Sequence, residues 1–332
     1  MIFTTVFSTS LWYNFGMYSG SGDTLNQIKR HIDACDYLTV AQLFLKSNFL
    51  LETPLSFDDI KPRLLGHWGT CHGINLAYAN LKYFYEKNPG YSFVLGPGHG
   101  FPALQANLFV DGELEKVDKN ATRNLHGIEY LCKNFSWPGG FPSHASPMTP
   151  NVICEGGELG YALATAFGAA LGHPEKTIAV LIGDGELETA TALSSLNMVK
   201  LAGGKANGKV IPILHLNGYK ISAPTIYGRS SERELMQMFR GFGFEPVMID
   251  GTNDDEFQQV LGKANRKTFI IMQTPKGYSG PKQLNGVKIE GNCAAHQVPL
   301  PEAKTDAYQR KMLEEWLKSY NFEELYNEFI AE

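Results

Sequence analysis

The 332-residue sequence has few cysteines and no pattern that would pair them or bind a structural metal. Its five cysteines include no Cys-x-x-Cys pair, and an odd number of scattered thiols is typical of a reducing compartment. A structural zinc site needs closer, paired ligands than His67, Cys71 and His72 or the distant Cys293-x-x-His296 provide. We therefore expect free cysteines, no zinc and a cytoplasmic location.

Basic blocks and long apolar runs are also missing. The net charge is −5 with both signs well mixed, which disfavours a nucleic-acid partner. The first twenty residues are apolar and aromatic but lack a basic start and are interrupted by polar residues, so they fit neither a signal peptide nor a membrane span. We expect an N-terminal arm over residues 1–37, one domain over residues 38–332, and no membrane partner.

Apolar runs and helical patterns alternate from about residue 91 onward. Such alternation predicts an α/β fold with a parallel sheet and helices on both faces. Strands are predicted at 91–95, 178–182, 210–216, 245–249 and 268–273. Helices are predicted at 160–171, 187–201, from Ser230 or Ser231, from Asp254, and at 313–320. No Walker A motif is present, and the glycines at 96–100 lack the Rossmann spacing.

The strongest chemical signal follows two of these strands. Asp184, between two glycines, follows the run 176–182, and Asn217 follows the run 210–216. Mg²⁺ prefers oxygen ligands and is commonly completed by phosphates. A carboxylate, an amide oxygen and a backbone carbonyl beyond it suit a magnesium-bound diphosphate, as in thiamine diphosphate sites. An Asp in a strand-to-helix turn is common in α/β proteins, so Asn217 is what favours a cofactor site.

Four of the nine histidines lie in glycine- or proline-rich contexts, namely His67, His99, His144 and His296. Histidines in such loops can approach a ligand closely and exchange protons near neutral pH. Any one of them alone is better explained as a packed or surface histidine. Four such contexts in one chain favour a shared site.

A set of ordered motifs gives a resemblance to a known family. The motifs are LLGHWGT (64–70), GPGHG (96–100), GGFPSH (139–144), EGGELGYAL (155–163), GDGE (183–186), LHLNGYK (214–220), TPKG (274–277) and HQVPL (296–300). From about Leu38 to the terminal helix, the chain resembles the amino-terminal, diphosphate-binding domain of phosphoketolases, which are thiamine-dependent enzymes related to transketolase. The sequence at 155–160 favours phosphoketolase over transketolase. Cys71-His72 replaces the family's usual Thr-Pro, and Asn151 and Cys154 stand where Gly and His are common.

The resemblance implies a transketolase-like fold that binds thiamine diphosphate and cleaves a ketose phosphate, leaving a two-carbon unit. With phosphate as the acceptor, the product is acetyl phosphate. The resemblance places Mg²⁺ on Asp184, Asn217 and the Tyr219 carbonyl. It places the four histidines around the thiazolium ring, where they stabilise a developing alkoxide and move protons. Further cofactor contacts are expected at Thr70, Gly157, Glu158, Leu159, Gly183, Gly185, Glu186 and Lys276.

Phosphoketolases are more than twice this long, and their second domain supplies a catalytic glutamate and most sugar-phosphate ligands. We therefore expect a separate chain with the pyrimidine-binding domain to complete the site, in a heterodimer or heterotetramer, with a sugar phosphate as substrate. Three alternatives stay open. They are a ketol or acyl transferase subunit with a non-phosphate acceptor, a non-catalytic scaffolding subunit, and a domain cut from a longer protein.

Overall fold

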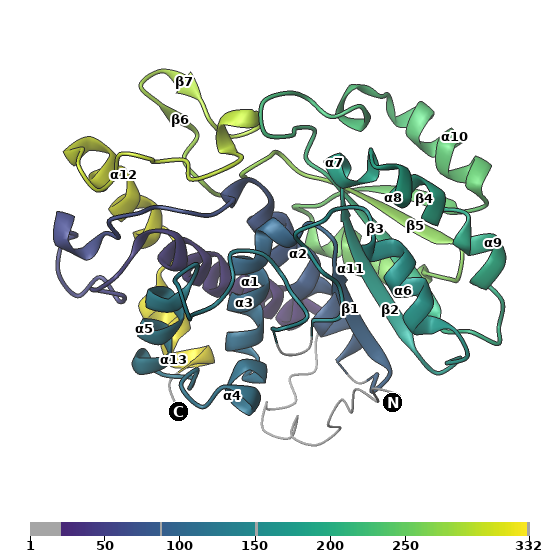
Figure 1. Cartoon of the computed structure of the whole chain (residues 1–332), viewed down its shortest axis with the longest axis horizontal. Helices are drawn as coiled ribbons and strands as arrows, with labels where there is room; N and C mark the ends of the chain where they lie inside the picture. Colours follow the sequence, from purple (N-terminus) through teal and green to yellow (C-terminus); the bar gives the residue numbers. More distant parts are fainter. Residues whose placement is uncertain (1–20, 87, 150–151, 331–332) are drawn as a thin grey trace.

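The computed structural model describes residues 21–86, 88–149 and 152–330 (Figure 1). The first helix, α1 (Ser21–Phe44), crosses the expected boundary between arm and domain at residues 37 and 38. Ile28, Ile32 and Cys35 on this helix are buried, so residues 21–37 pack as part of the same body. Residues 1–20 of the expected arm, and Asn151, lie outside the described residues.

A parallel five-stranded sheet forms the centre, with strand order β1-β2-β3-β5-β4. Its strands are β1 (Tyr91–Leu95), β2 (Thr177–Gly183), β3 (Lys209–Leu216), β4 (Glu245–Asp250) and β5 (Thr268–Gln273). All five predicted strands are confirmed within a residue or two. β2 and β3 are buried along almost their whole length, because helices cover both of their sides.

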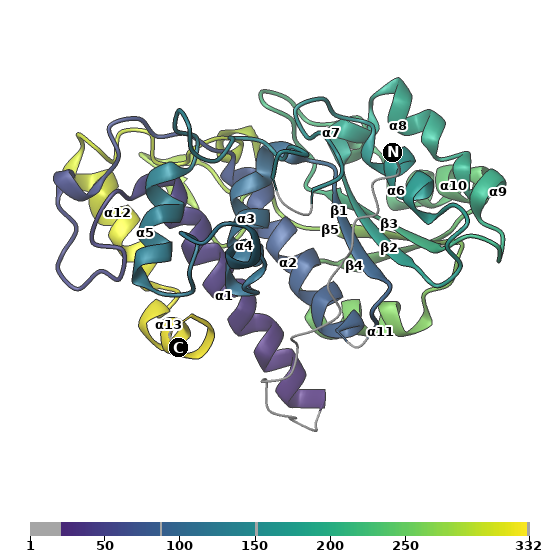
Figure 2. The same cartoon turned by 60° about the horizontal axis from the view of Figure 1, so that its bottom comes forward.

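Successive side chains along each strand point to opposite faces of the sheet, and they form two separate hydrophobic cores, one on each face. Figure 2 shows the sheet between the two helical layers. One layer holds α1, α2 (Trp68–Tyr85), α3 (Phe101–Val110) and α11 (Asp254–Lys263). The other holds α6 (Ala162–Ala170), α8 (Ala190–Ser195), α9 (Met198–Ala202) and α10 (Glu232–Phe242). The predicted α/β fold with helices on both faces is confirmed.

The helix predicted over 187–201 is wrong as a single element. The structure has α7 (Asp184–Leu187), then α8 and α9. Thr189 is extended, and its hydroxyl accepts a hydrogen bond from the Ala192 amide, which caps α8 and interrupts the helix. The predicted capping of α10 is confirmed, because Ser231 and Glu234 exchange side-chain and backbone hydrogen bonds.

The C-terminal segment returns to α1. Helices α12 (Ala307–Lys318) and α13 (Phe322–Phe329) pack there, and the rings of Tyr37 and Phe322 stack 3.9 Å apart. The remaining α-helices and strands are α4 (Glu113–Val117), α5 (Leu125–Asn134) and the hairpin of β6 (Gln283–Leu284) and β7 (Val287–Lys288). Short 3-10 helices lie at Phe57–Asp59, Gly98–Gly100, Tyr227–Arg229 and Cys293–Ala295. Within the described ranges, no helix has both the length and the apolar character needed to cross a membrane.

Candidate active site

The carboxyl ends of β2 and β3 are joined by the Asp184 side chain. One carboxylate oxygen accepts hydrogen bonds from the Gly218 amide (2.6 Å) and the Thr225 hydroxyl (3.1 Å), and the other accepts one from the Gly185 amide (2.9 Å). Gly218 directly follows Asn217, so the structure brings the two predicted ligand-bearing loops together. Burial raises the pKa of Asp184 to about 6, although these hydrogen bonds oppose the shift.

A buried lysine stands next to this carboxylate. The ammonium of Lys276 donates a hydrogen bond to the Tyr219 carbonyl (2.7 Å), the atom expected to be the third metal ligand. Burial lowers the pKa of Lys276 to about 8, and the negative charge of Asp184 partly counters the shift. A carbonyl oxygen has two lone pairs, so Tyr219 can accept from Lys276 and still bind a cation.

The carboxylate of Glu186 holds two backbone segments in place. Its two oxygens accept hydrogen bonds from the amides of Gly160 and Gly183, each 3.1 Å, and burial raises its pKa to about 7. Gly160 ends the loop 156–160, and Gly156 begins it. A Cβ on Gly98 would lie 2.2 Å from the Gly156 Cα, so the backbones at Gly98 and Gly156 are in contact. Between these anchors, Gly157 and Glu158 are exposed and Leu159 is half-buried.

The four predicted histidines form one cluster. The His67 ring lies at its centre, 5.1 Å from His99, 5.7 Å from His144 and 5.3 Å from His296, measured between ring centroids. His99 and His296 are 5.5 Å apart. The Nδ1 atoms of His67 and His296 are buried without a hydrogen-bond partner among the described residues. Buried polar atoms are rarely left unpaired, so these two nitrogens mark a place for a ligand.

The cluster is neutral at physiological pH. Burial lowers the pKa of every member, to about 4 for His296. The Lys276 ammonium adds to the lowering of the pKa of His67, His99 and His296. Repulsion between rings adds to it as well, from His144 on His67 and from His67 on His99 and His296. A neutral imidazole has one donor and one acceptor nitrogen, so the cluster offers both to a bound group.

Close packing connects the histidines to Lys276. A Cβ on Gly69 would lie 2.8 Å from the Lys276 Cε and 3.0 Å from the His296 Cα. The start of α2, which follows His67, therefore lies against both residues only because position 69 has no side chain. Lys276 thus stands between the histidine cluster and the Asp184 loop.

Two residues near the site were not predicted from the sequence. His215 on β3 is buried, with Nε2 2.8 Å from the Thr274 hydroxyl and Nδ1 3.5 Å from that of Thr70. It therefore connects Thr70, an expected cofactor contact, to the loop that carries Lys276. Thr225, fully buried, is the second. His215 could have been found from the sequence, because it is a histidine inside the apolar run 210–216. Nothing in the sequence indicated Thr225.

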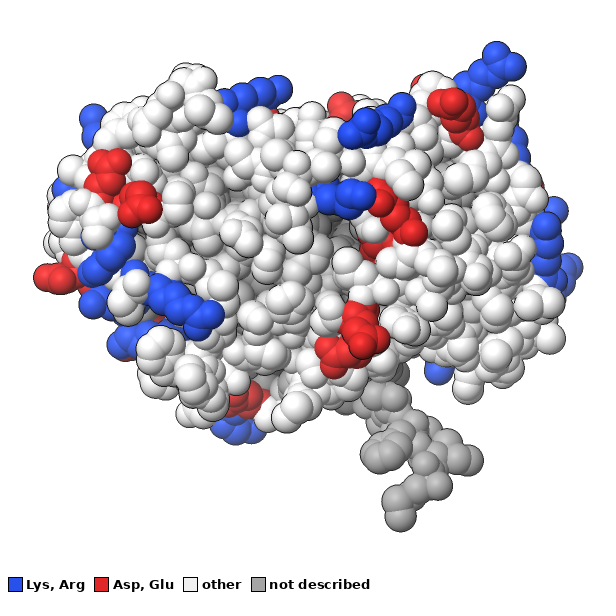
Figure 3. Space-filling model, turned by 45° about the horizontal axis from the view of Figure 1, so that its top comes forward, with Lys and Arg blue, Asp and Glu red and all other residues white. Residues whose placement is uncertain are grey.

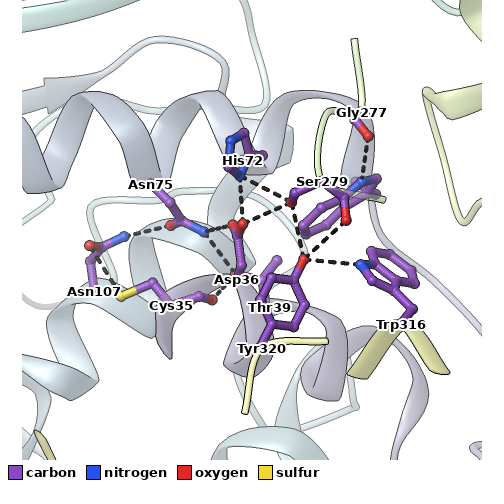
Figure 4. A network of polar contacts seen from close by, with 11 residues as sticks. Cys35, Asp36, Thr39, His72, Asn75, Asn107, Gly277, Ser279, Trp316 and Tyr320 are labelled. Atoms are coloured by element: carbon purple, nitrogen blue, oxygen red, sulfur yellow. Dashed lines mark hydrogen bonds and ion pairs between the residues drawn. The ribbon is translucent and has the colours of Figure 1, made fainter. Parts of the chain in front are cut away.

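A second polar network lies behind α2 (Figure 4). Asp36 on α1 accepts hydrogen bonds from Asn75, Ser279 and His72, at 2.7, 2.9 and 2.5 Å. Ser279 also pairs with the hydroxyl of Tyr320 (3.1 Å). In the same region, the Trp68 indole donates to the Gly277 carbonyl (3.1 Å). The turn after Lys276 is therefore held by α1, α2 and the C-terminal segment.

These groups fit the cofactor that the resemblance implies. Asp184 is a buried carboxylate whose charge lacks a full counter-ion, and the amide of Asn217 and the carbonyl of Tyr219 follow on the neighbouring strand end. These are the oxygen donors that Mg²⁺ binds. The nearby ammonium of Lys276 favours an anion, and the unpaired histidine nitrogens suit a polar ligand.

Comparison with known proteins identifies the family of the chain. The sequence matches the XFP N-terminal domain family over residues 20–269 and 262–331. The chain belongs to this family. The resemblance to the amino-terminal part of phosphoketolases is thereby confirmed.

Curated relatives extend well beyond this chain. A probable phosphoketolase of Rhodopseudomonas palustris (strain HaA2) is 41% identical over 331 residues, which cover 92% of the chain and 42% of the relative. A probable phosphoketolase of Bradyrhizobium diazoefficiens is 40% identical over 334 residues, covering 93% and 42%. The chain thus spans less than half the length of these relatives.

The fold is that of transketolases. The solved transketolase of Campylobacter jejuni matches with a TM-score of 0.59 and 19% identity, over 91% of this chain and 48% of that one. The transketolase of Leishmania mexicana matches with a TM-score of 0.57 and 19% identity, over 90% and 46%. At this identity the likeness concerns the fold alone.

Proposed function

We propose that this XFP N-terminal domain chain is the diphosphate-binding part of a phosphoketolase-like enzyme that depends on thiamine diphosphate and Mg²⁺. One observation carries the proposal. Lys276 lies between a buried carboxylate at the β2–β3 edge, Asp184, and a cluster of four neutral histidines. Such an arrangement offers a cation site, an anion site and proton carriers within one region of the fold.

The cofactor would be held by the groups that the fold gathers at the strand ends. Asp184, Asn217 and the Tyr219 carbonyl would bind Mg²⁺, and Lys276 would face the diphosphate. Thr70, Gly183, Gly185 and the 157–159 loop would line it, while Glu186 keeps that loop in place. When bound, thiamine diphosphate supplies a nucleophilic carbon and an electron sink for breaking a carbon–carbon bond beside a carbonyl.

The histidines would act on the oxygens of the substrate. A neutral His67 or His296 can donate a hydrogen bond to an oxygen that gains negative charge as the bond breaks. The same rings can pass protons during loss of water from the two-carbon fragment. His215, which touches both Thr70 and Thr274, would act as a positioning residue.

A further polypeptide segment is needed to close the site. The relatives are more than twice as long as this chain. Figure 3 shows that the centre of the face at the strand ends is hollowed and carries few charged side chains, as expected of an interface core. We propose that a separate chain with the pyrimidine-binding domain covers this face, in a heterodimer or heterotetramer. The five cysteines are free, which supports a reducing, cytoplasmic compartment.

The test combines this chain with the polypeptide that carries the missing domain. With thiamine diphosphate, Mg²⁺ and phosphate, we expect cleavage of fructose 6-phosphate or xylulose 5-phosphate to acetyl phosphate. His67→Asn should lower kcat by roughly 10²–10⁴-fold, whereas His173→Asn, at an exposed position, should leave it unchanged. Absence of any ketose cleavage in the mixture would refute the proposal.

The acceptor can be determined in the same experiment. If ketose cleavage occurs without phosphate and the two-carbon unit appears on a sugar or a carrier, the chain serves a ketol or acyl transferase instead. If the mixture binds thiamine diphosphate but cleaves no ketose, a scaffolding role is favoured.

A further inference from the structure

A cavity of about 520 Å³ is lined by residues that are not part of the candidate active site. It is bounded by the end of α1, by the 58–65 segment and by the residues after α5, on the left of Figure 1. A second hollow of about 260 Å³ adjoins it and shares Lys46, Ser47 and Lys133. The larger cavity has the size of a small-molecule site.

The inner wall of the cavity is apolar. Leu43 and Phe135 are buried, and Leu65 is half-buried beside them. Trp137 lines the cavity and is 56% exposed. A large exposed indole next to a preformed apolar wall can cover a ring-sized ligand.

Cations surround this wall, and three of them have no acidic partner. Lys46, Lys61 and Arg63 line the cavity, and none of the three forms an ion pair within the described part of the chain. Lys61 is half-buried; its ammonium donates to the Gln42 carbonyl (2.6 Å) and lies 5.6 Å from the Phe135 ring centroid. Burying a cation without a counter-ion is unfavourable, so this site is suited to receive an anion.

Other lining charges do not supply that anion. Lys133 is already paired with Glu129 on α5, and Asp58, the acidic residue of the lining, is not within ion-pair distance of a cation in the described ranges. The cavity therefore carries excess positive charge in a chain whose net charge is −5.

We propose that this cavity binds a small organic anion, in which one anionic head group is attached to an apolar, ring-sized body. Lys61 and Arg63 recognise the head group, while Phe135 and Trp137 contact the body. Leu65 of the lining lies two residues before His67, a member of the histidine cluster. The binding itself does not depend on the proposed function.

The test uses two fluorescent probes with nearly the same rings. 8-Anilinonaphthalene-1-sulfonate carries an anionic head, and N-phenyl-1-naphthylamine is its uncharged counterpart. We expect the full chain to bind the sulfonate saturably, with one site per chain by titration calorimetry. Arg63→Gln, at an exposed position, should weaken sulfonate binding about tenfold, and Lys61→Met should weaken it similarly.

Matched controls distinguish binding in the cavity from non-specific binding of the probe elsewhere on the protein. Lys311→Met, on the exposed surface of α12, should not change sulfonate binding, and neither Arg63→Gln nor Lys61→Met should weaken binding of the uncharged probe. Absence of saturable sulfonate binding would overturn the proposal. Unchanged sulfonate binding by both cavity variants, or an equal loss for both probes, would overturn it as well.

Discussion

Two buried polar clusters in this chain differ in how completely their hydrogen bonds are satisfied. Around Asp36, the carboxylate accepts three hydrogen bonds, and the network continues through Ser279 and Tyr320 to the Trp316 indole (Figure 4). In this network, the Nε2 atom of His72 has no hydrogen-bond partner among the described residues. Around His67, four rings crowd together, and the two central Nδ1 atoms of His67 and His296 have none.

The hydrogen bonds of the Asp36 cluster hold parts of the fold together, whereas the unpaired nitrogens of the histidine cluster are what a binding site needs. Asp36 and its partners connect α1, α2, the turn after Lys276 and α12, and a buried network whose central carboxylate accepts three hydrogen bonds rigidifies its surroundings. The His67 and His296 rings instead keep Nδ1 atoms that have no partner among the described residues, near the sheet edge where ligands of open α/β folds bind. The first cluster thus provides a rigid support on which the second is held open.

The largest effect on stability should come from breaking the Asp36 network. Asp36→Ala removes the acceptor shared by His72, Asn75 and Ser279, and the free energy of unfolding should fall by about 3–5 kcal/mol. Urea denaturation followed by circular dichroism measures it. Asp33→Asn on the same helix is the control, because burial raises the pKa of Asp33 to about 6 and its charge is already unfavourable. Equal losses for both variants would contradict the contrast.

A large effect on binding, without loss of the fold, is expected from Asp184→Ala. Without the carboxylate, Mg²⁺-dependent binding of thiamine diphosphate should weaken by roughly a hundredfold, about 2.7 kcal/mol. Calorimetry on the chain combined with its completing polypeptide measures it, and Asp255→Ala, on the exposed side of α11, should bind normally. Unchanged affinity in Asp184→Ala would remove this residue from the site.

The same carboxylate should make cofactor binding depend on pH. Its pKa of about 6 in the folded chain means that it is mostly protonated at pH 5 and mostly ionised at pH 7. Because Mg²⁺ needs the ionised form, affinity should rise about tenfold over this interval. Comparison with Asp184→Asn corrects for titration of the cofactor itself. A slope that persists in this variant would assign the effect elsewhere.

The linked effect on stability has the opposite sign. A folded-state pKa raised above the ordinary value of 3.8 means that the folded chain binds the proton more tightly than the unfolded chain. This contribution is fully present below about pH 4 and is lost as the pH rises through 6. In the ligand-free chain, Asp184 therefore lowers the free energy of unfolding as the pH rises from 4 to 7. A contribution of the reverse sign in the Asp184→Asn comparison would contradict this assignment.

The smallest effect should come from removing one hydrogen-bond donor at the periphery of the Asp36 network. Ser279→Ala removes one donor to Asp36, and the free energy of unfolding should fall by about 1 kcal/mol. The backbone at Ser279 has a φ of 64°, and Ser and Ala both carry a Cβ there, so the substitution removes only the hydroxyl. Thermal and urea unfolding measure the loss. A loss as large as that of Asp36→Ala would mean that the turn itself has collapsed.

Much of the fold could be predicted from local patterns. The five strands are continuous apolar runs, which is how doubly covered parallel strands appear in a sequence. The break at Thr189 was missed, because a threonine inside a helical pattern becomes a cap only when the packing of α7 turns the chain there. The start of α1 was missed because its buried positions, Ile28 and Ile32, face α2, more than forty residues further along the chain.

The sequence by itself determined the alternation of elements, the ligand types at the ends of β2 and β3, and the four histidines, because glycine-rich contexts and strand ends are local properties. Only the tertiary structure decided that His67 lies at the centre of the cluster, that His215 joins Thr70 to Thr274, and that Lys276 stands between the two halves of the site. Those relations depend on which strands are neighbours and how closely α2 approaches them, and these are long-range properties of packing.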